Sequence, residues 1–189
     1  MDCQKIKTIK SKNFLADIYI DEHCTSPRDA EWSDNFGTLI AFHSRMNLSD
    51  DDTWNKEELL DHINRDDIFA LPVYIYEHSN IALSTSEFLC KWDSGQVGYI
   101  FVSHEDIIKE YGELDLKKAE KVLDVEIETY SKYLNGECFG YQIYDMADKD
   151  CCPDSIDDCW GYIGLEHIEE EVNSCLEYWE RDKGGKLRK

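Results

Sequence analysis

The carboxylates of this chain are the residues whose types and spacing first suggest chemistry, and their densest run lies between residues 145 and 158. Its candidate acids are Asp148, Asp150, Asp154, Asp157 and Asp158. A calcium-binding loop of the EF-hand type has acids at alternating positions, glycine at the sixth position and glutamate at the twelfth. Counted from Asp148, these two positions hold Pro153 and Cys159. The pattern therefore fails, and we expect a solvated acidic loop rather than a metal site.

Eight cysteines and six histidines are the other candidate ligands and nucleophiles. No Cys-x-x-Cys pair occurs, and Cys151, Cys152, Cys159 and His167 have the spacing of no usual zinc site. The histidines are scattered, so no thiol nucleophile with a partner base is indicated. The chain also lacks a Gly-x-Ser-x-Gly or a His-Glu-x-x-His motif. We expect free thiols, no cofactor and no enzyme activity.

The net charge of the acids is more informative about function than their capacity to bind metal ions. The chain has 41 Asp and Glu against 20 Lys and Arg, a formal net charge of -21. Eight of the bases and one acid lie in residues 1–12 and 183–189, so the body between them has 40 acids against 12 bases, net -28. Solubility needs a net charge of only ~2–8, and self-repulsion at this level lowers stability. The charge predicts a strongly basic protein partner, such as a surface that holds DNA or RNA, and disfavours direct binding to nucleic acid.

Two acidic patches are the candidate partner-binding surfaces. The first is the loop run described above. The second surrounds the start of an expected helix and consists of Asp50, Asp51, Asp52, Glu57, Glu58 and Asp61. The helix dipole favours acids at that position, which explains part of the second patch. A hairpin loop has no such need for carboxylates, so the loop is the leading candidate, with a merely solubilising surface as the alternative.

Composition and the absence of apolar spans indicate a folded, cytoplasmic protein. Hydrophobic residues make up 42% of the chain, with five Trp, eleven Tyr and seven Phe, which suffices for a core. Residues 1–12 are basic and polar, and no apolar segment of a secretion signal follows them. The longest apolar stretch, residues 68–76, has the length of a strand and not of a membrane span.

The pattern of apolar residues predicts alternating strands and helices. Strands are expected over residues 14–20, 37–43, 68–76, 81–85, 96–102, 138–144 and 159–163. Helices are expected over residues 54–64, 104–111, 116–134 and 165–179, with Ser49 and Ser103 as caps for the first two. Pro72 favours an edge position for its strand. Gly–Tyr pairs at 98–99, 140–141 and 161–162 predict rings packed over strand glycines.

These elements predict the α+β class. We expect a single acidic domain over residues 13–182, with a mostly antiparallel sheet and helices packed on one face. A basic N-terminal segment, residues 1–12, and a basic tail, residues 183–189, flank it.

Several short motifs mark a resemblance. They are Trp92-Asp-Ser-Gly-Gln-Val-Gly-Tyr-Ile100, the segment 105–112, the segment 126–136, Phe139-Gly-Tyr141 and Asp158-Cys-Trp-Gly161. Together they resemble a family of small acidic proteins carried by phages and mobile elements of Gram-positive gut bacteria. The resemblance covers roughly residues 88–164, and the first ninety residues lie outside it. It implies an accessory phage gene, a setting that includes anti-restriction proteins and anti-CRISPR inhibitors of Cas9, and it transfers no catalytic residue.

The leading hypothesis is therefore a non-enzymatic, nucleic-acid-mimicking inhibitor of a bacterial defence nuclease, acting in the host cytoplasm. Cas9 with its guide RNA is the first target, since it holds its heteroduplex in a positively charged channel. The DNA groove of a restriction nuclease is the second. The alternatives are an accessory domain that binds some other protein, with charge serving solubility, and a hydrolase whose site the sequence does not reveal.

Overall fold

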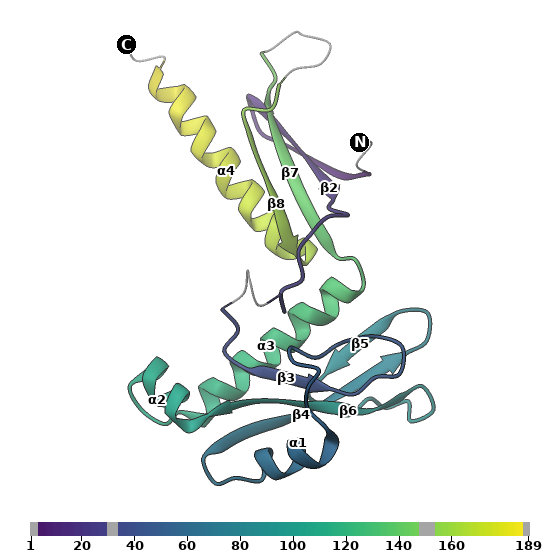
Figure 1. Cartoon of the computed structure of the whole chain (residues 1–189). Coiled ribbons are helices and arrows are strands. Elements are labelled where there is room, and N and C mark those ends of the chain that lie inside the picture. The colour runs from purple at the N-terminus through teal and green to yellow at the C-terminus, as the bar shows by residue number, and fades with distance from the viewer. Residues whose placement is uncertain (1–3, 30–33, 148–153, 187–189) are drawn as a thin grey trace. The chain divides into compact units, whose positions relative to one another are not determined.

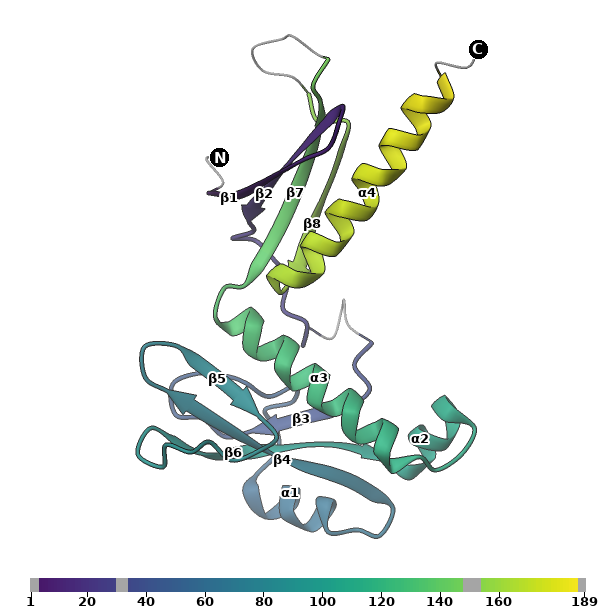
Figure 2. The same cartoon turned by 180° about the vertical axis from the view of Figure 1, so that it is seen from behind.

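The computed structural model describes residues 4–29, 34–147 and 154–186, with side chains described up to Asp182. Within these ranges the chain forms four helices and eight strands, and both sheets are antiparallel throughout. This confirms the α+β class. The chain divides into two compact units, which we call unit 1 (Met1–Thr25 and Gly136–Lys189) and unit 2 (Ser26–Asn135) (Figures 1 and 2). Each unit has its own sheet and its own core, whereas the sequence predicted a single sheet.

Unit 1 is a four-stranded sheet covered by one long helix. The strand order is β1 (Lys5–Lys10), β2 (Phe14–Ile20), β7 (Cys138–Asp145) and β8 (Asp157–Ile163). Helix α4 (Leu165–Lys186) packs along this sheet, as both views show (Figures 1 and 2). The core contains Phe14, Ala16, Ile18, Phe139, Tyr141, Ile143, Ile168, Val172 and Leu176. The expected one-sided packing of a helix on a sheet describes this unit.

Strand β1 corrects the expected basic segment over residues 1–12, because residues 5–10 pair with β2 at the edge of the sheet. Its lysines are exposed, and lysines on an edge strand discourage pairing with other chains. Lys5 lies 3.2 Å from an Asp17 carboxylate oxygen, and Lys7 lies 2.6 Å from one of Glu169. The strand was not predicted, because its lysines marked the segment as a basic extension rather than as part of a sheet.

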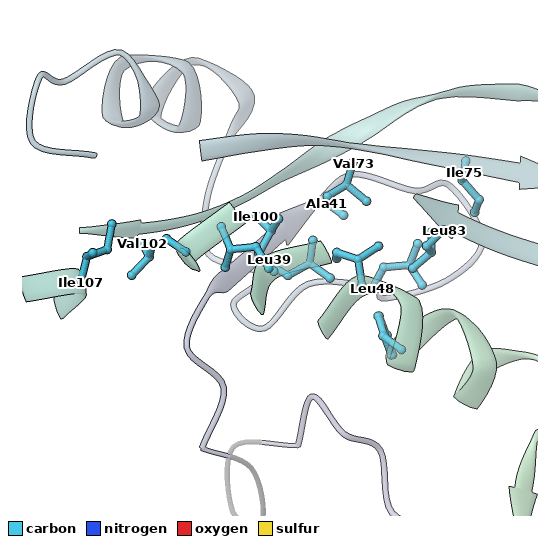
Figure 3. Packing of buried hydrophobic residues seen from close by; sticks show 13 residues of the cluster. Leu39, Ala41, Leu48, Val73, Ile75, Leu83, Ile100, Val102 and Ile107 are labelled. Carbon is cyan, nitrogen blue, oxygen red and sulfur yellow. The ribbon is translucent and has the colours of Figure 1, made fainter. Parts of the chain in front are cut away.

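Unit 2 has a second four-stranded sheet with helices on both faces. The strand order is β3 (Thr38–Ala41), β6 (Ser94–Ser103), β4 (Ile68–Glu77) and β5 (Ile81–Ser84). Helix α3 (Leu116–Leu134) packs against one face through Leu123 and Ile127, which join the core drawn in Figure 3. Helix α1 (Lys56–Ile63) packs against the other face through Leu59. Helix α2 (His104–Tyr111) begins at its Ser103 cap, as expected.

Pro72 lies in an interior strand, which corrects the expected edge position. Strand β4 has β6 on one side and β5 on the other. However, β5 pairs only with Tyr74–Glu77, so the half of β4 that holds Pro72 has a single neighbour. A proline without a backbone N–H is tolerated there for the same reason as in an edge strand.

Two strand glycines sit where a side chain would collide with a neighbour. A Cβ at Gly140 would lie 2.1 Å from the Trp160 ring, so a ring does cover this glycine, as predicted. A Cβ at Gly98 would lie 2.0 Å from the Ile40 carbonyl oxygen. Gly98 therefore allows a close approach of backbone rather than of a ring.

Candidate partner-binding surface

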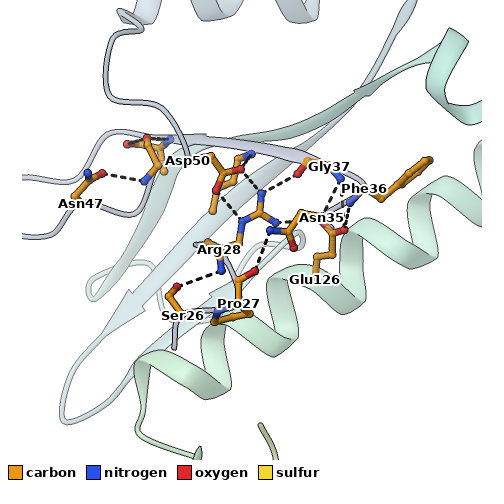
Figure 4. A network of polar contacts seen from close by, with 12 residues as sticks. Ser26, Pro27, Arg28, Asn35, Phe36, Gly37, Asn47, Asp50 and Glu126 are labelled. Carbon is orange, nitrogen blue, oxygen red and sulfur yellow. Dashed lines mark hydrogen bonds and ion pairs between the residues drawn. The ribbon is translucent and has the colours of Figure 1, made fainter. Parts of the chain in front are cut away.

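A buried arginine ties the start of unit 2 to its sheet and to α3 (Figure 4). The Arg28 guanidinium donates from Nε to Asp50 (2.8 Å), from one Nη to the Gly37 carbonyl (2.8 Å) and from the other Nη to Glu126 (3.0 Å). A second bond to Asp50 makes that pair bidentate. Burial lowers the pKa of Arg28, but the two carboxylates outweigh burial and leave the pKa raised. Glu126 also accepts the Phe36 N–H at 2.5 Å. We call Arg28, Asp50 and Glu126 the Arg28 network.

The Arg28 network removes Asp50 from the candidate surface. Besides its two bonds with Arg28, the Asp50 carboxylate accepts the Leu39 N–H at 2.7 Å. A carboxylate beside a buried guanidinium is held by that charge. The Asp50 carboxylate therefore faces the protein, and its side chain is only 22% exposed, although the residue as a whole is exposed, like its neighbours Asp51 and Asp52.

Helix α1 is capped by Asn55 and not by Ser49. The Asn55 side chain accepts the N–H groups of Glu57 and Glu58 at 3.0 Å, and the Glu58 carboxylate accepts the Asn55 N–H at 3.1 Å. This reciprocal arrangement is a capping box. Ser49 instead bonds the Ala41 N–H and carbonyl, each at 2.8 Å. The acids around α1 are thus mounted on a helix whose start is fixed.

The five remaining acids of the second patch are exposed, but they are not equivalent. Glu58 serves the cap, and Asp51 accepts the Thr53 N–H at 2.9 Å, the main reason why the pKa of Asp51 is lowered. Glu57 lies in the first turn of α1, where the helix dipole favours it. Asp61 lies in the last turn, where the dipole opposes a negative charge. Folding of the helix therefore does not explain Asp61.

The acidic surface continues past α1 to the start of α2. The His104 N–H donates to the Asp67 carbonyl at 2.8 Å, which joins the segment after α1 to the first residue of α2. Asp66 and Asp67 are exposed on one side of this junction, and Glu105 and Asp106 on the other. Sequence reasoning missed this junction because β4, β5 and β6 separate the two segments along the chain. We call Asp52, Glu57, Asp61 and Asp66 the α1 surface.

A recess of about 630 Å³ lies beside the α1 surface. Its lining includes His43, Arg45, Asp51, Asp52 and Trp54. The His43 ring and the Arg45 guanidinium both bind the Glu77 carboxylate, at 3.1 and 2.9 Å. The recess is thus lined by the acids Asp51 and Asp52 and by the basic residues His43 and Arg45, which are paired with Glu77.

The structure treats the five acids of the hairpin loop unequally. Asp148 and Asp150 lie outside the described residues. Asp157 accepts the Trp179 Nε1–H at 3.0 Å and so supports the core of unit 1. Asp154 and Asp158 are exposed, which leaves these two as described candidates for partner binding.

Helix α3 and the turn before it carry a further set of acids. Glu113, Glu120, Asp124 and Glu128 are all exposed. However, Lys132 pairs with Glu128 at 3.0 Å, and the Thr85 hydroxyl donates to Asp124. Lysines between the acids make this face mixed in charge.

The described residues contain no group of three or more His, Cys, Asp or Glu that could hold a metal ion. The free thiols among them are Cys24, Cys90, Cys138, Cys159 and Cys175. Burial, with a hydrogen bond to Cys24, raises the pKa of Cys138 to about 12. Cys151 and Cys152, part of the zinc pattern considered from sequence, lie outside the described residues.

Over the part of the chain that the structure describes, no helix combines the length and apolar character needed to cross a membrane. Comparison of the chain with protein-family models, with curated proteins and with solved structures found no match.

Proposed function

We propose that the protein is a non-catalytic inhibitor that binds the basic nucleic-acid channel of a bacterial defence nuclease through the α1 surface. Cas9 with its guide RNA is the first target to test, because its heteroduplex lies in a positively charged channel. A restriction nuclease is the second. The observation that carries the proposal is an exposed set of carboxylates, on and beside one anchored helix, that includes charges the fold does not need.

Unit 2 supplies most of the charge for this role. It holds 23 acids against 10 bases, net -13, while unit 1 holds 18 against 10, net -8. The lysine and arginine side chains that line the channel of a nuclease would face the carboxylates on the short helix α1. Complementary charge of this kind accelerates association and selects partners.

The spacing on α1 suits a surface that normally holds phosphates. Glu57 and Asp61 are one helical turn apart, ~6 Å along the axis. Alternate phosphates on one DNA strand are ~7 Å apart along the duplex. Carboxylates at this spacing can occupy two alternate phosphate sites along a basic groove.

The test compares charge removal at the α1 surface with equal charge removal elsewhere. The variant Asp52→Asn/Glu57→Gln/Asp61→Asn loses three charges there, and the control Glu113→Gln/Glu120→Gln/Glu170→Gln loses three exposed charges elsewhere. Association with Cas9–guide RNA complex is measured between 50 and 300 mM salt, with DNA cleavage alongside. We expect the parent to bind, with an association rate that falls steeply with salt, and the α1 variant to bind about tenfold more slowly than the control. Equal rates for both variants would refute the assignment of the surface.

The mixed charge of α3 favours a second function, an accessory protein-binding domain whose acids serve solubility. Under that function both variants lose solubility equally, and neither affects nuclease activity. Solubility at high protein concentration, measured on the same variants, separates the two functions.

A further inference from the structure

The turn between β5 and β6 exposes two large apolar side chains. Leu89 is 103% exposed and Trp92 is 96% exposed, far above the other exposed apolar residues of the described chain. Full exposure of a tryptophan and a leucine three residues apart leaves much apolar surface in water. We call residues 88–93 the Trp92 turn.

The base of the Trp92 turn is braced. Phe88 packs on Tyr76 with ring centroids 5.7 Å apart. The Ser94 hydroxyl donates to the Cys90 carbonyl at 2.5 Å, and the Asp93 carbonyl accepts the Glu77 N–H at 2.9 Å. The two exposed side chains are therefore displayed by a closed turn, which reduces the entropy lost when a partner immobilises them.

The Trp92 turn is connected to the acidic side of unit 2. Glu77, whose N–H binds the turn, uses its carboxylate to bind His43 and Arg45. These two residues line the recess that also contains Asp51 and Asp52. A single partner can therefore cover the turn and the neighbouring acids together.

We propose that the Trp92 turn is an apolar anchor that inserts Trp92 and Leu89 into an apolar pocket rimmed by lysine or arginine, on the same basic protein that the α1 surface attracts. The inference thus rests on the proposed function. Tryptophan is enriched among the few interface residues that carry most of the binding energy. Charged groups around such a centre act mainly on the rate of encounter, so the two parts of the surface have different kinetic roles.

Charge decides between this occupant and two others. A second copy of the chain would bring together two bodies of net charge -21, which repel each other. An anionic membrane repels the same charge, and its attraction to proteins depends on clusters of basic residues. Lys91 is the one base in the Trp92 turn. A basic protein is the occupant that gains from both the apolar tip and the acids beside it.

The experiment measures binding of Leu89→Ala, Trp92→Ala and the double variant to immobilised Cas9–guide RNA complex. We expect the dissociation rate of the double variant to rise about tenfold or more, with the association rate and the thermal midpoint unchanged. Tyr178→Ala, which removes an exposed aromatic ring of unit 1, is the control and should dissociate like the parent. The α1 variant, in contrast, should change mainly the association rate.

Several outcomes would overturn the inference. If the parent binds and the double variant dissociates like the parent, the anchor is wrong and the proposed function stands. If the parent binds neither the Cas9–guide RNA complex nor a restriction nuclease, the proposed function fails and the anchor's assigned occupant fails with it. Binding of the parent to phosphatidylcholine–phosphatidylglycerol vesicles that Trp92→Ala abolishes would assign the turn to a lipid surface. Self-association in sedimentation that Trp92→Ala abolishes would assign it to a second copy.

Discussion

Two acid-rich regions of unit 2 contain the same types of side chain, but their carboxylates have opposite effects on the stability of the fold. In the Arg28 network, Asp50 and Glu126 surround a guanidinium whose side chain is 4% exposed, and every carboxylate bond is directed inward. On the α1 surface, Asp52, Glu57 and Asp61 are exposed to solvent. The first region stabilises the fold, and the second adds repulsion to it. Position relative to one arginine, rather than residue type, separates a structural acid from a candidate binding acid.

The sharpest way to break this comparison is to remove the arginine. Arg28→Met leaves Asp50 and Glu126 near a buried site without their counter-charge, which typically costs about 3–5 kcal/mol. We expect this loss in the free energy of unfolding, measured with urea. Arg65→Met is the control, because Arg65 pairs with Asp67 on the surface, where both side chains are more than half exposed. A control as damaging as Arg28→Met would show that the network has no special role.

The next largest effect separates two aspartates that are two residues apart. Asp50→Asn weakens two bonds to Arg28 and one to the Leu39 N–H, and we expect a loss of about 1.5–3 kcal/mol. Asp52→Asn removes the same formal charge from an exposed site and should change stability by less than about 0.5 kcal/mol. Urea unfolding of both variants tests this ordering. Equal losses would place Asp50 with the surface acids, as the sequence suggested.

This pair also shows what sequence could and could not predict. Most strands and all four helices follow from local signals, such as the apolar period of residues 116–134 and the Ser103 cap. Asp50 could not be separated from Asp51 and Asp52, because its charged partner, Arg28, is 22 residues away along the chain. The two units were missed for a related reason. Strands β2 and β7 pair directly, yet all the residues of unit 2 separate them along the chain. No Gly/Pro-rich linker marks the junctions in the sequence.

A carboxylate of unit 1 extends the comparison to pH. Glu180 accepts bonds from the Ser11 hydroxyl and the Asn13 N–H, both at 2.7 Å, and the Ser11 bond is the main cause of its lowered pKa. Because the pKa is lower in the folded state, this stabilisation is present above the unfolded value of ~4.3 and is lost as the pH falls through the folded pKa. Glu180→Gln should therefore lower the thermal midpoint at pH 7, and the difference from the parent should vanish in acid. A difference that persists unchanged at pH 3 would contradict this account.

The smallest expected effect concerns the hairpin loop, the leading candidate from sequence. Asp154→Asn/Asp158→Asn removes two exposed charges and keeps Asp157, which holds the Trp179 ring N–H. Folding should be unchanged, because exposed substitutions alter stability by less than about 0.5 kcal/mol. Association with the Cas9–guide RNA complex should slow by about twofold, less than for the α1 variant, because unit 2 carries the larger share of the net charge. If the loop variant slows association more than the α1 variant, the partner engages unit 1 first, and Asp154 and Asp158 replace Glu57 and Asp61 as the primary contact.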